Sequence, residues 1–358
     1  MRLLQTLLAL FLVAVTMSTT ATPPVFSTVK SGVPLVFPKD FGAHPDYRTE
    51  WWYATGWLET PDKKPLGFQI TFFRSATEHD RGNPSAFAPA QLIIGHAALS
   101  DPTVGKLQHD QRSARAGFDL AYAKTGDTDV KIDDWQLQRN VDGSYRAIIT
   151  ARDFTLQLAL TSGAPPMLQG DKGFSRKGPL AQEASYYYSQ PQLKVSGTVT
   201  RNGARVKVLG TAWLDHEWST IVLDAQASGW DWLGANLDDG GALMAFQVRR
   251  KGGGILWSHA ALRDRAGLVT QFAQEQVHFA PSRQWRSPRT NATYPVATTI
   301  TTDTTRWTLI PLQDDQELDS RQSTGSVYWE GGVTVLRNDQ PAGRGYLELT
   351  GYLTPLKL

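Results

Sequence analysis

The sequence contains no cysteine in its 358 residues. This absence excludes disulfide bonds, thiolate metal ligands, a cysteine nucleophile and a lipid-modified cysteine. A charge excess of either sign is also lacking, since 36 basic residues stand against 34 acidic residues and the formal charge is +2. The charges are scattered without blocks, so no nucleic-acid partner is predicted. Stability therefore has to come from the burial of apolar side chains.

Long hydrophobic runs are missing outside the N-terminus. The apolar run from Leu3 to Val15 follows a basic Arg2 and precedes small and hydroxylated residues that end at Ala21. This order is typical of a cleavable signal peptide, and the run is short for a membrane span. We therefore predict cleavage after Ala21 and an exported, periplasmic or secreted protein without a stable membrane span. An uncleaved N-terminal anchor is the alternative.

The sequence also lacks the signatures of several common catalytic sites. There is no G-x-S-x-G elbow, no H-E-x-x-H zinc motif, no P-loop and no dinucleotide-binding fingerprint. The seven histidines include no pair at the i, i+4 spacing of metal ligands on a helix. We therefore expect neither a cofactor nor a metal.

Period-two alternation recurs along the chain, as in "GFQITFFRS" and "QLIIGHAALS". The dipeptides Asp142-Gly143, Asn202-Gly203 and Asp239-Gly240 suit tight hairpin turns between such runs. No long segment has a helical period, and residues 161–182 are rich in Gly, Pro and charge, which predicts a loop. Many short antiparallel strands favour a barrel or a sandwich.

The chain is long enough for two β-domains, and two barrels fit its length better than one. The hairpin at Asn202-Gly203 is expected to complete the first domain. We predict a signal peptide at 1–21, an N-terminal β-domain at 22–219 and a C-terminal β-domain at 220–358.

The stretch "TAWLDHEWST" at 211–220 is the first candidate site. Strand alternation places Trp213, Asp215 and Glu217 on one face and His216 and Trp218 on the other. The two carboxylates raise each other's pKa if both are desolvated. The alternative is a strand end at which the carboxylates cap backbone amides and His216 is a hydrogen-bonded core residue.

A second candidate is "TEWWYATGWLE", in which Glu50 precedes two tryptophans. Alternation places Glu50 and Trp52 on one face and Trp51 and Tyr53 on the other. An apolar wall of this kind is expected to raise the pKa of the Glu50 carboxyl. The alternative is a barrel strand whose aromatic side chains fill the core.

Further candidates lie elsewhere in the chain. Trp230 and Trp232 share a face in "SGWDWLGANLDDGG", and His96 lies in the otherwise apolar "GHAALSD". Glu330 and Glu348 lie among aromatic residues near the C-terminus. Each of these residues fits a structural role in a core as well as a role in a site.

Taken together and in order, "TEWWYATGWLE", "GHAALSD", "AWLDHEWS", "GWDWLGANLDDG", "YWEGGVTV" and "GYLELTGY" resemble the carotenoid 1,2-hydratase (AttH-type) family of double-lipocalin proteins. The resemblance is to the branch labelled as predicted secreted hydrolases. It implies an all-β fold of two consecutive lipocalin-like (calycin) antiparallel barrels, with a hydrophobic site near their junction. It also implies that the "DHEW" stretch is functional, with His216 and Trp218 matching positions that the hydratases need.

We therefore expect an enzyme that acts on a hydrophobic, terpenoid- or lipid-like molecule by acid–base chemistry, as a hydratase or a hydrolase. An acid protonates a double bond, tryptophan faces stabilise the carbocation, and a base accepts a proton from the attacking water. The alternative is a non-catalytic lipocalin-type carrier. The predicted catalytic residues are Asp215, His216, Glu217 and Glu50, and the predicted substrate-binding residues are Trp218, Trp230, Trp232, Trp52, Tyr53 and His96.

Overall fold

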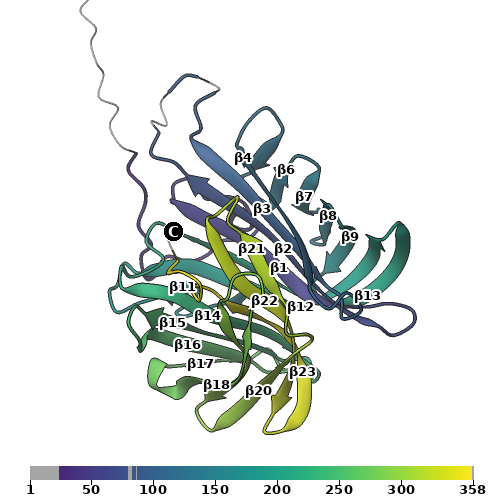
Figure 1. The fold of residues 1–358 in the computed structure, drawn as a ribbon. Coiled ribbons are helices and arrows are strands. Elements are labelled where there is room, and N and C mark those ends of the chain that lie inside the picture. The colour runs from purple at the N-terminus through teal and green to yellow at the C-terminus, as the bar shows by residue number, and fades with distance from the viewer. Residues whose placement is uncertain (1–23, 80–82, 86, 357–358) are drawn as a thin grey trace, which may run out of the picture.

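The computed structural model describes residues 24–79, 83–85 and 87–356, whose strands form two antiparallel sheets (Figure 1). The predicted signal peptide at 1–21 lies outside the described residues. Helical structure in the described part is confined to two short 3-10 turns, η1 (Lys39–Phe41) and η2 (Gln274–Gln276). Within the same residues, no helix has the length and apolar character needed to span a membrane.

The first sheet has 13 strands and follows the order β4-β3-β2-β1-β13-β12-β9-β8-β7-β6-β5, with β10 and β11 paired to β12. Its strands are β1 (Thr49–Glu59), β2 (Pro65–Ala76), β3 (Gln91–Ser100), β4 (Leu107–Arg115), β5 (Ala121–Ala123), β6 (Asp129–Ile132), β7 (Trp135–Arg139), β8 (Tyr145–Thr150), β9 (Phe154–Thr161), β10 (Met167–Leu168), β11 (Phe174–Arg176), β12 (Ala184–Arg201) and β13 (Ala204–Ser219).

The second sheet has 10 strands and follows the order β17-β16-β15-β14-β23-β22-β20-β19-β18, with β21 paired to β22. Figure 1 shows it in green to yellow beside the first sheet. Its strands are β14 (Ala227–Leu237), β15 (Ala242–Arg250), β16 (Ile255–Arg263), β17 (Val269–Phe272), β18 (Val277–Arg286), β19 (Thr293–Thr302), β20 (Thr305–Pro311), β21 (Glu317–Ser320), β22 (Ser326–Arg337) and β23 (Gln340–Leu349).

Each sheet curves until its ends pack together. In the first sheet β3 and β4 pack against β6, and in the second β16 packs against β18. The interior of the first barrel is filled by large apolar side chains such as Phe68 and Trp135, and that of the second by Trp307 and Trp329. The fold is therefore all-β, with two consecutive lipocalin-like barrels, as the sequence predicted.

The hairpin between β12 and β13 brings the candidate stretch to the centre of the first sheet. Asn202 and Gly203 have φ angles of 49° and 76°, and Arg201 pairs with Ala204 across this two-residue turn. Positive φ at both central positions is the requirement of the turn that matches strand twist. β13 consequently lies between β12 and β1 over residues 211–219.

The prediction of a loop over residues 161–182 is only partly right. β10 and β11 fall in this segment and both pair with the first half of β12. β9 pairs with β12 only from Lys194 onwards. The backbone N–H and C=O groups of the first half of β12 therefore need another hydrogen-bonding partner on that edge. Two- and three-residue strands carry too little alternation for the sequence to reveal them.

We expect Leu214→Ala to lower the free energy of unfolding by about 2–5 kcal/mol, the usual range for emptying a buried leucine site. Leu214 is 1% exposed in the first core, whereas Leu209 on the same strand is 68% exposed. The matched control Leu209→Ala is therefore expected to change stability by less than about 0.5 kcal/mol. Equal losses in urea unfolding of the two variants would contradict the placement of β13.

Candidate functional site

β13 separates two buried polar networks. Its residues 211–219 pair with β1 on one side and with β12 on the other. His216 contacts Glu50 of β1 inside the first barrel, whereas Asp215 bonds Trp213 and Tyr187 at the junction with the second sheet. Both carboxylates of "DHEW" are thus on the opposite face from the histidine, as strand alternation predicted.

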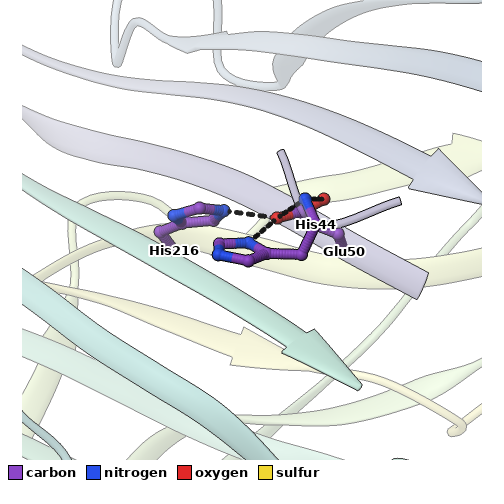
Figure 2. Close-up of side chains that lie close together, drawn as sticks. All are labelled: His44, Glu50 and His216. Carbon is purple, nitrogen blue, oxygen red and sulfur yellow. Dashed lines mark hydrogen bonds and ion pairs between the residues drawn. The ribbon is translucent and has the colours of Figure 1, made fainter. Parts of the chain in front are cut away.

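The inner network is centred on Glu50, which is fully buried (Figure 2). Its Oε1 lies 2.8 Å from His216 Nε2 and 2.7 Å from His44 Nδ1. Its Oε2 accepts a hydrogen bond from Arg74 Nε at 2.7 Å. The pairing of β1 with β2 sets Arg74 directly opposite Glu50. His44 lies in the segment between η1 and β1.

The expectation that an apolar wall raises the pKa of Glu50 is wrong. Burial favours the neutral carboxyl, but the hydrogen bonds of His216 and His44 and the charge of Arg74 outweigh it and hold the pKa of Glu50 below its ordinary value. Burial also opposes a charge on His44, yet Asp40 and Glu50 raise its pKa. Burial lowers the pKa of His216, so this ring stays neutral.

Aromatic stacking fixes the two histidines. The ring of Trp218 stacks on His44 with centroids 3.7 Å apart, and that of Trp52 stacks on His216 at 4.5 Å. Tyr188 Oη lies 3.0 Å from His216 Nδ1. One face of Trp218 and one face of Trp52, both predicted to bind substrate, are therefore covered by the protein's own imidazoles.

The inner network also has the spacing of a metal site. One possible ligand atom from each of His44, Glu50 and His216 lies within 4.8 Å of the other two. One feature disfavours a cation here. The Arg74 guanidinium already neutralises the Glu50 carboxylate. The contacts present describe a hydrogen-bonded charge cluster.

The junction network is centred on Asp215. Its Oδ1 accepts hydrogen bonds from Ser189 Oγ and Trp213 Nε1, both at 2.6 Å, and its Oδ2 accepts one from Tyr187 Oη at 2.7 Å. Burial raises the pKa of Asp215 to about 7 against the effect of these donors, and the charge of Glu217 adds to the rise. The expected interaction between the two carboxylates is present, but burial is the larger cause.

Glu217 is held by residues that sequence reasoning missed. Lys177 Nζ lies 2.9 Å from its Oε1, and Ser185 Oγ donates to the same oxygen. The ammonium of Lys177 sits over the rings of Tyr187 and Phe246 at 4.7 and 4.6 Å. Burial lowers the pKa of Lys177. Lys177 follows β11 in the segment expected to be a loop, so no pattern placed it near Glu217.

The remaining predicted residues divide between the junction and a separate interdomain contact. Trp232 Nε1 donates to Tyr187 Oη at 3.0 Å, and the ring of Tyr53 meets Trp232 edge-on at 5.2 Å. Trp230 is partly exposed at this junction. His96 instead contacts Tyr328 Oη at 2.7 Å and Ser323 Oγ at 2.8 Å, which ties β3 to the second sheet.

Two open clefts of about 640 and 560 Å³ are lined by residues of both sheets. Their walls are mainly polar and charged, so neither has the character of a hydrophobic pocket. The first is lined by His109, Asp110, Gln111, Arg152, Arg289, Asp319, Arg321 and Gln322, and the second by Gln192, Thr211, Asn236, Leu237, Asp238, Gly240, Thr334, Pro341, Gly343 and Arg344.

Comparison with known proteins gives one family and several similar structures. The model of the AttH-like family matches residues 28–352. An AttH protein from Nitrosomonas europaea is 62% identical over 91% of this chain and 100% of its own, with a TM-score of 0.87. A search of curated proteins finds no match.

Two similar structures are more distant in sequence. Kievitone hydratase from Nectria haematococca has 14% identity over 93% of this chain and 98% of its own, with a TM-score of 0.70. CghA with Sch210972 has 12% identity over 93% and 98%, with a TM-score of 0.55. At these identities the likeness establishes the shared double-barrel fold.

We expect Glu50→Gln to lower the free energy of unfolding at neutral pH by about 3–5 kcal/mol, because it leaves Arg74 buried without its partner. The pKa of Glu50 is depressed, so its stabilisation is present above the ordinary value of 4.5 and is lost as the pH falls through the folded value. The deficit of the variant should therefore shrink on acidification.

The control for this measurement is Glu59→Gln on the same strand, which removes only a surface ion pair with Lys63. We expect it to have little effect. A Glu50→Gln chain as stable as the Glu59→Gln chain would contradict the charge cluster.

We expect Zn²⁺ to leave the melting temperature unchanged at neutral pH, both in the natural chain and in His44→Ala. Ligands that bind only the folded state raise its stability, so a metal site would show as a concentration-dependent rise. A rise in the natural chain that His44→Ala abolishes would establish a metal centre instead.

Proposed function

The chain belongs to the AttH-like family, and from this premise we propose that it is a hydratase-like enzyme acting on a hydrophobic, terpenoid- or lipid-like substrate by acid–base chemistry at the junction of its two sheets. A shared fold with kievitone hydratase supports the reaction class. The proposal depends on the chemistry of the junction itself.

One observation carries the proposal: Asp215 is a fully buried carboxyl set among aromatic side chains at the junction. The indole N–H of Trp213 donates a hydrogen bond to the Asp215 carboxyl. The indole N–H of Trp232 donates to the hydroxyl of Tyr187, which in turn donates to Asp215. A carboxyl whose pKa is about 7 is matched to proton transfer in either direction at neutral pH. The indole faces are the groups that stabilise a developing carbocation.

The Asp215 carboxyl and the indole rings of the junction suit an addition of water better than a hydrolysis through a serine nucleophile. The serines nearest the junction carboxylates, Ser185 and Ser189, donate to Glu217 and Asp215, so neither is paired with a histidine base. In a hydration, a proton adds to one alkene carbon, water attacks the cation at the other, and a carboxylate accepts the proton that water releases. Proton and hydroxyl both end on the substrate.

The lipocalin-type carrier has less structural support. Large side chains fill the interiors of both barrels, and the two clefts lined by residues of both sheets are polar. A carrier needs an apolar space that encloses its ligand. Export of the enzyme is part of the proposal and rests on the sequence of residues 1–21.

Farnesol provides a test, because it is a neutral isoprenoid alcohol with trisubstituted double bonds. We expect the purified chain to convert it to a product heavier by one water, with label incorporated from heavy-oxygen water. Asp215→Asn should reduce the rate by roughly 10²- to 10⁴-fold, the usual contribution of a positioned acid or base.

The matched control is Asp238→Asn, since Asp238 is an exposed aspartate in the turn between β14 and β15. Lipids that copurify with the protein are extracted and incubated with it in parallel. Recovery of these lipids unaltered, with no product from any of them or from farnesol, would favour a carrier.

A further inference from the structure

Two glutamates face each other across neighbouring strands of the second sheet. In the antiparallel pair of β22 and β23, Glu330 is directly opposite Glu348. Side chains in such positions are about 5 Å apart at Cβ, and like charges there destabilise the sheet. Glu330 is 1% exposed, whereas Glu348 is partly exposed.

Polar atoms without partners gather around this pair. Neither carboxyl oxygen of Glu330 has a hydrogen bond of good geometry within the described part of the chain, nor have the hydroxyls of Tyr53 and Tyr346. The hydroxyls of Tyr53 and Tyr328 nevertheless interact with the Glu330 carboxyl, and the hydroxyl of Tyr346 interacts with Ser100. Buried polar groups of native proteins are nearly always fully hydrogen-bonded, so hydrogen bonds of poor geometry gathered in one place indicate a bound water or a polar ligand group.

Among the residues that the structure describes, no lysine, arginine or histidine forms an ion pair with Glu330 or Glu348. The nearby Lys177 is engaged by Glu217, and Arg249 is engaged by Asp231. Burial is the main cause that raises the pKa of Glu348, to about 8, and the charges of Asp215, Glu217 and Asp231 add to it while Trp230 opposes it. Burial and then the charge of Glu348 hold the pKa of Glu330 well above its ordinary range.

We propose that Glu330 and Glu348 share a proton and act as the acid of the junction site, and that the water consumed in the reaction binds beside the hydroxyls of Tyr53 and Tyr346. This inference rests on the proposed function and names its proton donor. Glu348 is the member that touches substrate, because it is the more exposed and Trp230 is beside it.

The reaction balances with these groups. The carboxylic acid of Glu348 gives its proton to an alkene carbon and becomes a carboxylate, while the other carbon becomes a cation held against the face of Trp230. The bound water attacks the cation, and its surplus proton passes to the Asp215 carboxylate. Exchange with solvent then returns a proton to the glutamate pair.

Infrared spectroscopy tests the shared proton without a substrate. At neutral pH the full chain should show the carbonyl band of a protonated carboxyl. The band should shift in Glu348→Gln and in Glu330→Gln, where the remaining glutamate holds the proton alone, and should weaken when both are replaced. Glu317→Gln is the matched control, since Glu317 is a buried glutamate of the same sheet that Ser287 and Thr290 satisfy. A band that neither single substitution shifts and that the double substitution does not weaken would overturn the proposal.

Stability shows whether the variants fold. The raised pKa of Glu348 means that its contribution to stability is present below its ordinary 4.5 and is lost as the pH rises through about 8. A glutamine does not titrate, so both variants should be as stable as the natural chain at neutral pH, or more stable, and should lose less stability at alkaline pH. A loss of stability in both variants would indicate a structural role and contradict the proposal.

Turnover of farnesol completes the experiment. We expect each glutamine variant to lose roughly 10²- to 10⁴-fold in rate and Glu317→Gln to lose none. If the natural chain converts farnesol and the variants do so equally well, the glutamate pair is not the acid and the proposed function stands. If the natural chain converts neither farnesol nor a copurified lipid, the proposed function fails, and the acid with it, whatever the infrared band shows.

Discussion

The burial of charge on both faces of one strand is the constraint on which this structure depends. Over residues 212–219 of β13 the side chains of both faces are buried, and both faces carry titratable groups. An unpaired buried charge is costly, and a protein compensates it or keeps the group neutral. The two faces use these two different solutions. Toward the first barrel the charges are paired. Toward the junction Glu217 is paired with Lys177, whereas burial raises the pKa of Asp215.

The contrast between Glu50 and Asp215 follows from their neighbours. Both are fully buried carboxyls on adjacent strands, yet the pKa of one is lowered and that of the other is raised. Arg74 and His44 supply positive charge to Glu50, whereas Asp215 has neutral donors and the like charge of Glu217. The charges around Glu50 compensate one another, which suits a structural role in the first barrel. A buried carboxyl whose pKa lies near neutral pH costs stability, and such groups are concentrated at active sites.

The sequence predicted the fold well, because alternation and turn dipeptides are local signals. The Asn202-Gly203 turn and the two faces of residues 213–218 follow directly from such signals. The partners across space did not follow. The contact of Arg74 with Glu50 depends on the register between β1 and β2. Lys177 contacts Glu217 from a segment that has no alternation of apolar and polar residues. Glu330 lies opposite Glu348 because of the register of a hairpin, which the sequence leaves open. The direction of a pKa shift depends on these partners, which is why the sequence misjudged Glu50.

The arrangement of charge also bears on the kind of substrate that suits the junction. Several carboxyls with a single ammonium, Lys177, form a site whose neutral state depends on retained protons. An anionic substrate would repel the carboxylates, and a permanent cation would draw the protons off and leave no acid. A neutral, apolar molecule does neither. It excludes water from the acids, which strengthens their electrostatic interactions, and it acquires positive charge only when a proton is transferred. The aromatic faces and the carboxylates then both stabilise that charge, so the site favours the transition state over the bound hydrocarbon.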